Sequence, residues 1–160
     1  MLEIGRVVEL CLAGLEVKSV LDVGTGSGVF AEGFVKKGIS VTGVDVNQGF
    51  LETARRLVPG VDFQMGLAER LPFAAGSFDL VFLGHVLHET NDPALALGEA
   101  RRVGRYRVSV LEWPYRREEH GPPLEHRLKP ETIVALANAA GFRDVEWIQL
   151  THMELFRLTL

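Results

Sequence analysis

The segment Val20-Leu21-Asp22-Val23-Gly24-Thr25-Gly26-Ser27-Gly28 combines an apolar run, an acidic residue and three glycines at alternate positions. Because glycine lacks a Cβ atom, such a run can turn sharply and lets a ligand approach the backbone. A helix that follows the turn presents unpaired N–H groups to that ligand. The spacing differs from the dinucleotide fingerprint G-x-G-x-x-G, which needs a glycine where Val29 stands. The segment predicts a cofactor cradle at the end of a strand.

A second acidic residue, Asp45, ends the apolar segment 39–45. It follows the glycine loop by about twenty residues, the place where a carboxylate meets a ribose diol in folds of this kind. The other interpretation is a helix-capping aspartate, but Asn47 already provides a cap for the next helix. We therefore expect Asp45 to accept hydrogen bonds from both ribose hydroxyls.

Strand-like and helix-like patterns alternate along the chain and must position these residues. β-Branched and apolar runs predict strands at 19–23, 39–45, 61–66, 78–84, 106–113, 144–149 and 155–160. An amphipathic helix comes first, and capping signals predict further helices at 28–37, 47–57, 92–103 and 130–141. Such alternation implies right-handed crossovers and a parallel sheet with helices on both faces. The last two strands leave no room for a helix between them, so the final strand returns antiparallel.

Several motifs together carry a resemblance to a known family. Asp22 followed by G-x-G-x-G resembles the first motif of class I S-adenosylmethionine-dependent methyltransferases. The runs Ala68-Glu69-Arg70-Leu71-Pro72-Phe73, Gly76-Ser77-Phe78-Asp79-Leu80-Val81 and Val86-Leu87-His88-Glu89 are similar to the short-form ubiquinone/menaquinone-biosynthesis-type members. The resemblance covers nearly the whole chain. It implies an α/β, Rossmann-like, doubly wound sheet of seven strands, mostly parallel with a C-terminal antiparallel hairpin.

The resemblance also implies an activity and a set of residues. S-Adenosylmethionine would be the methyl donor and S-adenosylhomocysteine the product, with transfer to a small-molecule acceptor by in-line displacement. The implied cofactor-binding residues are Asp22, Gly24, Thr25, Gly26, Gly28, Asp45, Val46, Leu67, Ala68, Glu69 and Gly84.

Two departures from the family pattern stand out. The residue before Ala68 is typically an aspartate whose carboxylate receives the adenine amino group, and here it is Leu67. A charge-assisted hydrogen bond of this kind contributes about 1–3 kcal/mol. Either the chain binds the cofactor more weakly, or Gln64 or Glu69 replaces the carboxylate. The second departure is a missing Lys/Arg-Pro-Gly-Gly turn, of which Gly104-Arg105 remains, so we expect a tight two-residue connection.

An acceptor that must lose a proton needs a base, and histidines follow the fourth predicted strand. Ligands of open α/β sheets bind beyond the carboxyl ends of the strands, which places His85 nearest the cofactor methyl group. We expect His85 to be the base, with a packed loop histidine as the alternative. His85 and His88 could share a helical face beside Glu89, but their spacing matches neither usual zinc-helix order, and we expect no metal.

The longest irregular stretch follows the fifth predicted strand. Loops beyond the strand ends carry specificity in such folds, so we expect an acceptor pocket bordered by His88, Trp113, Tyr115, His120 and His126. A basic, aromatic loop suits a flat or anionic acceptor, and a plain surface loop is the alternative. The Pro-Pro-Tyr box of base-methylating enzymes would follow the fourth strand, where Gly84-His85 stands, so nucleic acid is not expected as a substrate.

Length and composition favour one domain over residues 1–160, since 47% hydrophobic and 24% charged residues fit a single globular core. The net charge of −4 argues against general nucleic-acid affinity. Between Arg101 and Lys129, however, eight basic residues stand against four acidic ones, which gives a basic lobe or simply a solvated helix end and loop. Neither a secretory leader nor a membrane span is predicted, and the single Cys11 is interpreted as a buried thiol of a cytoplasmic protein.

Two other functions share this fold. A catalytically idle S-adenosylmethionine-binding module, acting as a partner or regulatory subunit, is favoured by Leu67, whereas the retained glycine loop and Asp45 favour the enzyme. Aminopropyl transfer usually needs a carboxylate-rich groove, and the acceptor side here is net basic. The sequence identifies neither the acceptor nor the oligomeric state.

Overall fold

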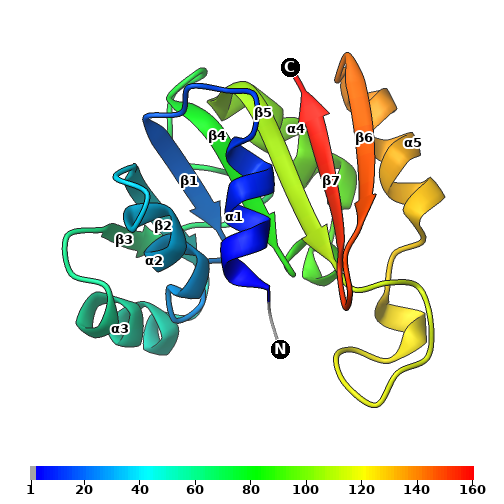
Figure 1. Ribbon diagram of the computed structural model, residues 1–160, viewed down its shortest axis with the longest axis horizontal. Coiled ribbons are helices and arrows are strands. Elements are labelled where there is room, and N and C mark those ends of the chain that lie inside the picture. Colours follow the sequence, from blue (N-terminus) through cyan, green and yellow to red (C-terminus); the bar gives the residue numbers. More distant parts are fainter. Residues whose placement is uncertain (1–2) are drawn as a thin grey trace.

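A computed structural model describes residues 3–160, which form a seven-stranded mixed sheet with helices on both faces (Figure 1). The strands are β1 (Ser19–Val23), β2 (Ser40–Asp45), β3 (Asp62–Met65), β4 (Phe78–Gly84), β5 (Gly104–Glu112), β6 (Asp144–Gln149) and β7 (Glu154–Thr159). The α-helices are α1 (Ile4–Leu12), α2 (Val29–Val35), α3 (Gln48–Leu57), α4 (Pro93–Val103) and α5 (Pro130–Ala140). Two short 3₁₀ helices are η1 (Leu87–Glu89) and η2 (Leu124–His126). Residues 1 and 2 of the predicted domain lie outside the described range.

The strand order is β3-β2-β1-β4-β5-β7-β6, which confirms the predicted doubly wound topology. β1 lies between β2 and β4, and Val23 is in register with Val44 on one side and Leu83 on the other. β7 runs antiparallel to both β5 and β6, as the missing helix between the last two strands predicted. The chain order reverses at β1 and β4, so the ligand crevice of such a sheet is expected beyond their carboxyl ends.

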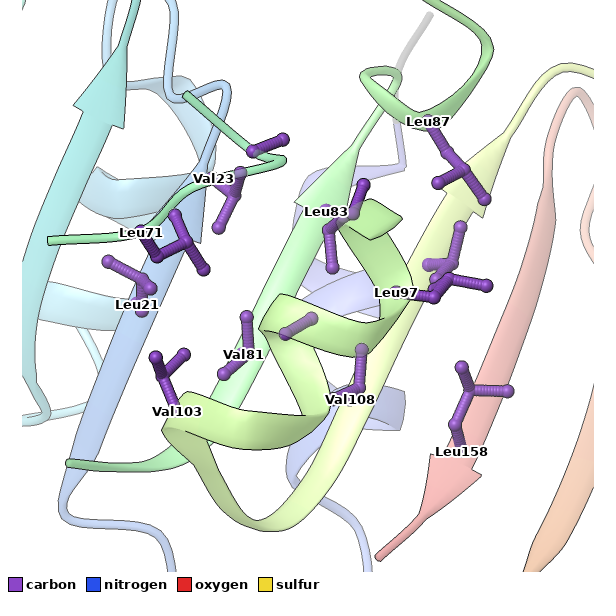
Figure 2. Close-up of a cluster of buried hydrophobic side chains, with 14 of the residues drawn as sticks. Leu21, Val23, Leu71, Val81, Leu83, Leu87, Leu97, Val103, Val108 and Leu158 are labelled. Carbon is purple, nitrogen blue, oxygen red and sulfur yellow. The ribbon is translucent and has the colours of Figure 1, made fainter. Parts of the chain in front are cut away.

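Apolar side chains cover both faces of the sheet. On one face, residues of α4 and α5 pack against β1, β4, β5 and β7, and Figure 2 shows α4 lying over this cluster with Leu97 and Val103 pointing toward the strands. On the other face, α1, α2 and α3 form a second cluster that includes Phe34, Phe82 and the buried Cys11. The two layers make the sheet a rigid support for the loops at its carboxyl edge. No helix of residues 3–160 has both the length and the apolar character that crossing a membrane requires.

Two predicted boundaries were wrong. The connection between α4 and β5 has no loop residues, because Gly104 is the first residue of β5 and is in register with Phe78, where the pairing then shifts through an irregularity. α2 ends at Val35 and not at Lys37, because the chain turns through Lys36 and Lys37 before Gly38, whose φ is +79°.

The predicted basic lobe is divided between the two ends of β5. The arginines at positions 101–107 lie at its amino end, where Arg105 forms an ion pair with the buried Asp79. The basic residues at positions 116–129 follow its carboxyl end, in the loop that projects beyond the sheet (Figure 1). Because the two groups lie at opposite edges, they do not act on a ligand as one positive surface.

Candidate functional site

A cavity of about 520 Å³ lies at the carboxyl ends of β1, β2 and β4, where the topology places a ligand crevice. Most of the predicted cofactor residues border it: Gly24, Gly26, Asp45, Val46, Leu67, Ala68, Glu69 and Gly84. The structure thus brings together four chain segments that are separated by about twenty residues each in the sequence.

The glycine loop joins β1 to α2 through two backbone bends. Gly24 and Gly26 have φ values of +70° and +55°, which side chains other than glycine rarely adopt. A Cβ atom on Gly24 would lie 2.7 Å from Val86 Cγ2, so this position also lacks room for a side chain. The N–H groups of Gly24 and Thr25 donate to the Val44 carbonyl at 2.8 and 2.9 Å, which ties the loop to β2.

Asp45 holds the glycine loop and borders the cavity with the same carboxylate. Its Oδ2 accepts from the Gly26 N–H and its Oδ1 from the Asn47 N–H, both at 2.9 Å. Asn47 in turn caps α3 by accepting from the Phe50 N–H, as predicted. Each carboxylate oxygen has further acceptor capacity, so hydroxyl donors in the cavity can bind without displacing the loop.

Asp22 and Thr25 lie behind the loop and do not border the cavity, and neither does Gly28. Burial raises the pKa of the Asp22 carboxyl to about 7, although the Thr25 hydroxyl, which donates to it at 2.8 Å, and a backbone hydrogen bond with Ala31 act in the opposite direction. Ala31 is in the first turn of α2, whose N-cap Gly28 provides no side-chain acceptor. Asp22 therefore stabilises the start of α2 from beneath the loop.

The segment after β3 forms the far end of the cavity. Leu67 is 52% exposed and borders the cavity together with Ala68 and Glu69. The Gln64 amide instead donates to Asp62 at 3.2 Å and is not part of the lining. Of the two residues considered as replacements for the missing aspartate, the geometry places Glu69 at the cavity.

His85 borders the cavity, and its ring packs against two aromatic side chains. The residue has a φ of 58°, and its ring lies 5.1 Å from the Trp113 ring and 6.4 Å from the Phe30 ring, centroid to centroid. Both ring nitrogens are buried and have no hydrogen-bond partner among residues 3–160. Burial lowers the pKa of His85 and so favours the neutral ring. Its role as a base stays a prediction, and because His85 precedes η1 it does not share a helical face with His88.

His88 forms a tight pair with Glu112, the last residue of β5. Glu112 is 1% exposed, and its Oε1 accepts from the His88 N–H at 3.0 Å while its Oε2 lies 2.8 Å from His88 Nδ1. Burial alone would lower the pKa of His88, but the hydrogen bond and charge of Glu112, together with Glu89, raise it above its usual value. The sequence analysis missed Glu112, although an acidic residue ending an apolar strand was a signal for it.

The loop after β5 is built around Arg127, which is 5% exposed. Its guanidinium donates to the carbonyls of Pro114, His120 and Pro122 and to the Glu118 carboxylate, at 2.7–3.0 Å. It also lies over the Trp113 ring, 5.5 Å from the centroid. This one side chain therefore determines the path of a loop that has little regular structure.

The predicted acceptor residues divide into two groups. His88 and His126 border a second cleft of about 410 Å³, together with Glu89 and Pro122. Trp113 packs against His85, while Tyr115 and His120 are exposed and border neither cleft. Tyr115 lies beside Lys129 on the outside of the loop.

The strand order and the glycine loop define a Rossmann-like fold of the class I methyltransferase type. The crystal structure of a SAM dependent methyltransferase from Aquifex aeolicus has the same fold, with a TM-score of 0.87 and 22% identity over 98% of this chain and 89% of that one. Residues 21–107 match the family described as Methyltransferase domain, and the chain belongs to this family.

Two relatives are similar to the chain over part of their length. It is 37% identical to a demethylmenaquinone methyltransferase of Renibacterium salmoninarum, over 92% of this chain and 63% of that protein. It is 34% identical to a ubiquinone biosynthesis O-methyltransferase of Alkalilimnicola ehrlichii, over 60% of this chain and 41% of that protein. The chain thus spans less than two thirds of the length of these relatives.

Proposed function

We propose that the chain binds S-adenosylmethionine in the 520 Å³ cavity and transfers its methyl group to a small phenol- or quinol-type acceptor. The observation that carries the proposal is Asp45, whose carboxylate is fixed by Gly26 and Asn47 at the edge of the cavity. The acceptor class is supported by the relatives, which are named for methylation in menaquinone and ubiquinone biosynthesis.

The residues that border the cavity fit the parts of this cofactor. Gly24 and Gly26 leave the backbone open to the methionine end, and Asp45 offers acceptors to the ribose hydroxyls. The exposed Leu67 and its neighbour Ala68 give an apolar surface for the adenine ring, with Glu69 as a nearby acceptor. When bound, the sulfonium supplies a methyl carbon that is already activated for displacement.

For this reaction the protein mainly has to align the acceptor atom, the methyl carbon and the sulfur. Gly84, at the end of β4, lies between the glycine loop and the histidines and leaves the reacting region free of a bulky side chain. A Cβ atom there would lie 2.6 Å from the Phe82 ring, so glycine is required by packing as well. Holding two reactants in line supplies most of the rate enhancement in such a displacement.

Calorimetric titration tests the cofactor directly. We expect binding of S-adenosylmethionine and S-adenosylhomocysteine, and no comparable binding of NAD or ATP. Asp45→Asn removes the charge that fixes the loop, and we expect about tenfold weaker binding, corresponding to about 1.4 kcal/mol. Asp62→Asn, at the start of β3 and outside the cavity, is the matched control and should leave affinity unchanged.

Methyl release over a panel of phenols, quinols and small acids then tests the enzyme. Absence of binding by both adenosyl compounds would overturn the cofactor assignment. Cofactor binding without any methyl release across the panel would instead support the idle binding module.

A further inference from the structure

The second cleft adjoins the cofactor cavity. Glu89 borders both, so both spaces lie against η1, just beyond the carboxyl end of β4. The cleft has a volume of about 410 Å³, and Pro122 and His126 from the loop after β5 border its opposite side. An acceptor in this cleft would therefore lie next to the reacting end of a ligand in the cavity.

The orientation of the His88 ring follows from its partner. A carboxylate can only accept, so the contact of 2.8 Å to Glu112 places the proton on Nδ1 in the neutral ring. The lone pair is then on Nε2, which is not in contact with Glu112 and lies 3.8 Å from Glu89 Oε1. Glu112 is fixed in turn by the His88 backbone N–H, so carboxylate and ring are held by the same short segment.

We propose that His88, oriented by Glu112, accepts the proton of the methyl acceptor, and that the cleft beside His88 and His126 binds an acceptor with an ionisable hydroxyl group. This inference rests on the proposed methyl transfer. In the reaction, the hydroxyl proton passes to Nε2 and the acceptor oxygen forms a bond to the methyl carbon. The carbon–sulfur bond breaks, its electron pair stays on sulfur, and His88 returns the proton to water.

Charged groups from several elements face His88 and determine its titration. Glu112 from β5 and Glu89 from η1 favour the imidazolium, whereas Arg127 from the following loop opposes it. His126 borders the same cleft, and the electrostatic influence of His88 reaches His85. The base must be neutral to accept a proton, so the methyl-transfer rate should rise with pH through a pKa of His88 above the ordinary 6.5.

Glu112→Gln separates catalysis from a purely structural contact. The amide keeps a hydrogen-bond acceptor but loses the charge, so the rising limb of the pH–rate profile should move to lower pH. We expect His88→Gln to lower kcat about 100-fold or more while the cofactor Kd stays unchanged. If His88 only connected η1 to β5, Glu112→Gln would change neither the pH at which the methyl-transfer rate rises nor kcat at the plateau of the pH–rate profile. That result would overturn the proposal.

NMR titration of the histidine rings in the full chain gives a readout that needs neither cofactor nor turnover. One ring should titrate above 6.5, disappear in His88→Gln and move to lower pH in Glu112→Gln. His152→Gln, in the turn between β6 and β7, is the control and should remove a different signal. An unperturbed His88 titration in Glu112→Gln would contradict the pairing on which the proposal depends.

A coloured phenol tests the cleft itself. We expect 4-nitrophenol, bound near neutral pH with S-adenosylhomocysteine present or absent, to gain phenolate absorbance as its proton passes to His88. His88→Gln should abolish the gain, with correct folding verified by its NMR spectrum. No gain in the wild type, or an equal gain in His88→Gln, would overturn the assignment of His88. Cofactor calorimetry tests the proposed function separately. A failure of the His88 assignment can therefore be distinguished from a failure of S-adenosylmethionine binding.

Discussion

The two halves of the carboxyl edge of the sheet are built by different means. On the proposed cofactor side, backbone groups make the site: positive φ angles at Gly24 and Gly26, and main-chain N–H groups held by Asp45. On the proposed acceptor side, buried charged side chains make it, with His88 held by Glu112 and the loop held by Arg127. The conformation of the glycine loop follows from its own glycines, whereas the pairing of His88 with Glu112 depends on two elements that meet only in the fold.

This difference has a consequence for function. The glycine loop is fixed to the end of β2 through Val44 and Asp45, so its conformation does not depend on the loop after β5. A loop fixed by one arginine can change length and lining while the sheet stays intact. The contrast predicts that substitutions on one side affect one ligand and leave the other nearly unchanged.

Gly24→Ala should give the largest effect and tests whether the cofactor side depends on the backbone. The added Cβ atom meets Val86 and forces a residue with a side chain to a φ of +70°, which together cost about 4 kcal/mol of stability. Gly38→Ala is the matched control, because its φ of +79° carries the same strain with nothing within 4 Å of the added atom. Thermal unfolding of both variants compares them, and equal losses would show that the contact with Val86 does not matter.

Arg127→Met should come next and tests whether the acceptor side is independent. Removal of the guanidinium leaves the His120 and Pro122 carbonyls without their donor and the Pro114 carbonyl with only the Arg116 N–H, and we expect a loss of about 3 kcal/mol. Hydrogen exchange of residues 114–127 should accelerate and acceptor turnover should fall, with cofactor affinity unchanged by calorimetry. Arg117→Met, an exposed position of the same loop, is the control. A parallel loss of cofactor binding would show that the two halves are coupled.

Leu67→Asp should have the smallest effect and sharpens the contrast at the adenine end. A carboxylate at this exposed position of the lining gains an acceptor for the adenine amino group but lies close to Glu69. We expect S-adenosylmethionine binding to tighten by about tenfold at most, that is about 1.4 kcal/mol. Leu67→Asn, similar in size and uncharged, separates the charge from the loss of the leucine. Unchanged affinity in both variants would show that Glu69 already replaces the aspartate.

The sequence by itself determined the topology and the residues of the glycine loop and strand ends from which the cofactor site is proposed. Asp22, the glycines and Asp45 are recognisable because turn geometry and strand ends are local properties, and the missing helix between β6 and β7 required an antiparallel return. The start of β5 was misplaced because Gly104 fits a helix stop as well as a strand residue, and pairing with Phe78 decided between them.

Only the tertiary structure determined the contacts on which the proposed acceptor side rests. His88 and Glu112 are 24 residues apart and become partners because β4 and β5 end side by side in the sheet. In the sequence, Arg127 is one of several charged residues of the loop. Only the fold shows that its guanidinium is buried and donates to backbone carbonyls. His85 stood out in the sequence, yet packing between Phe30 and Trp113 covers both of its ring nitrogens. The backbone conformation of a turn depends mainly on its own residues. The protonation and orientation of a side chain depend instead on the groups that long-range packing places beside it.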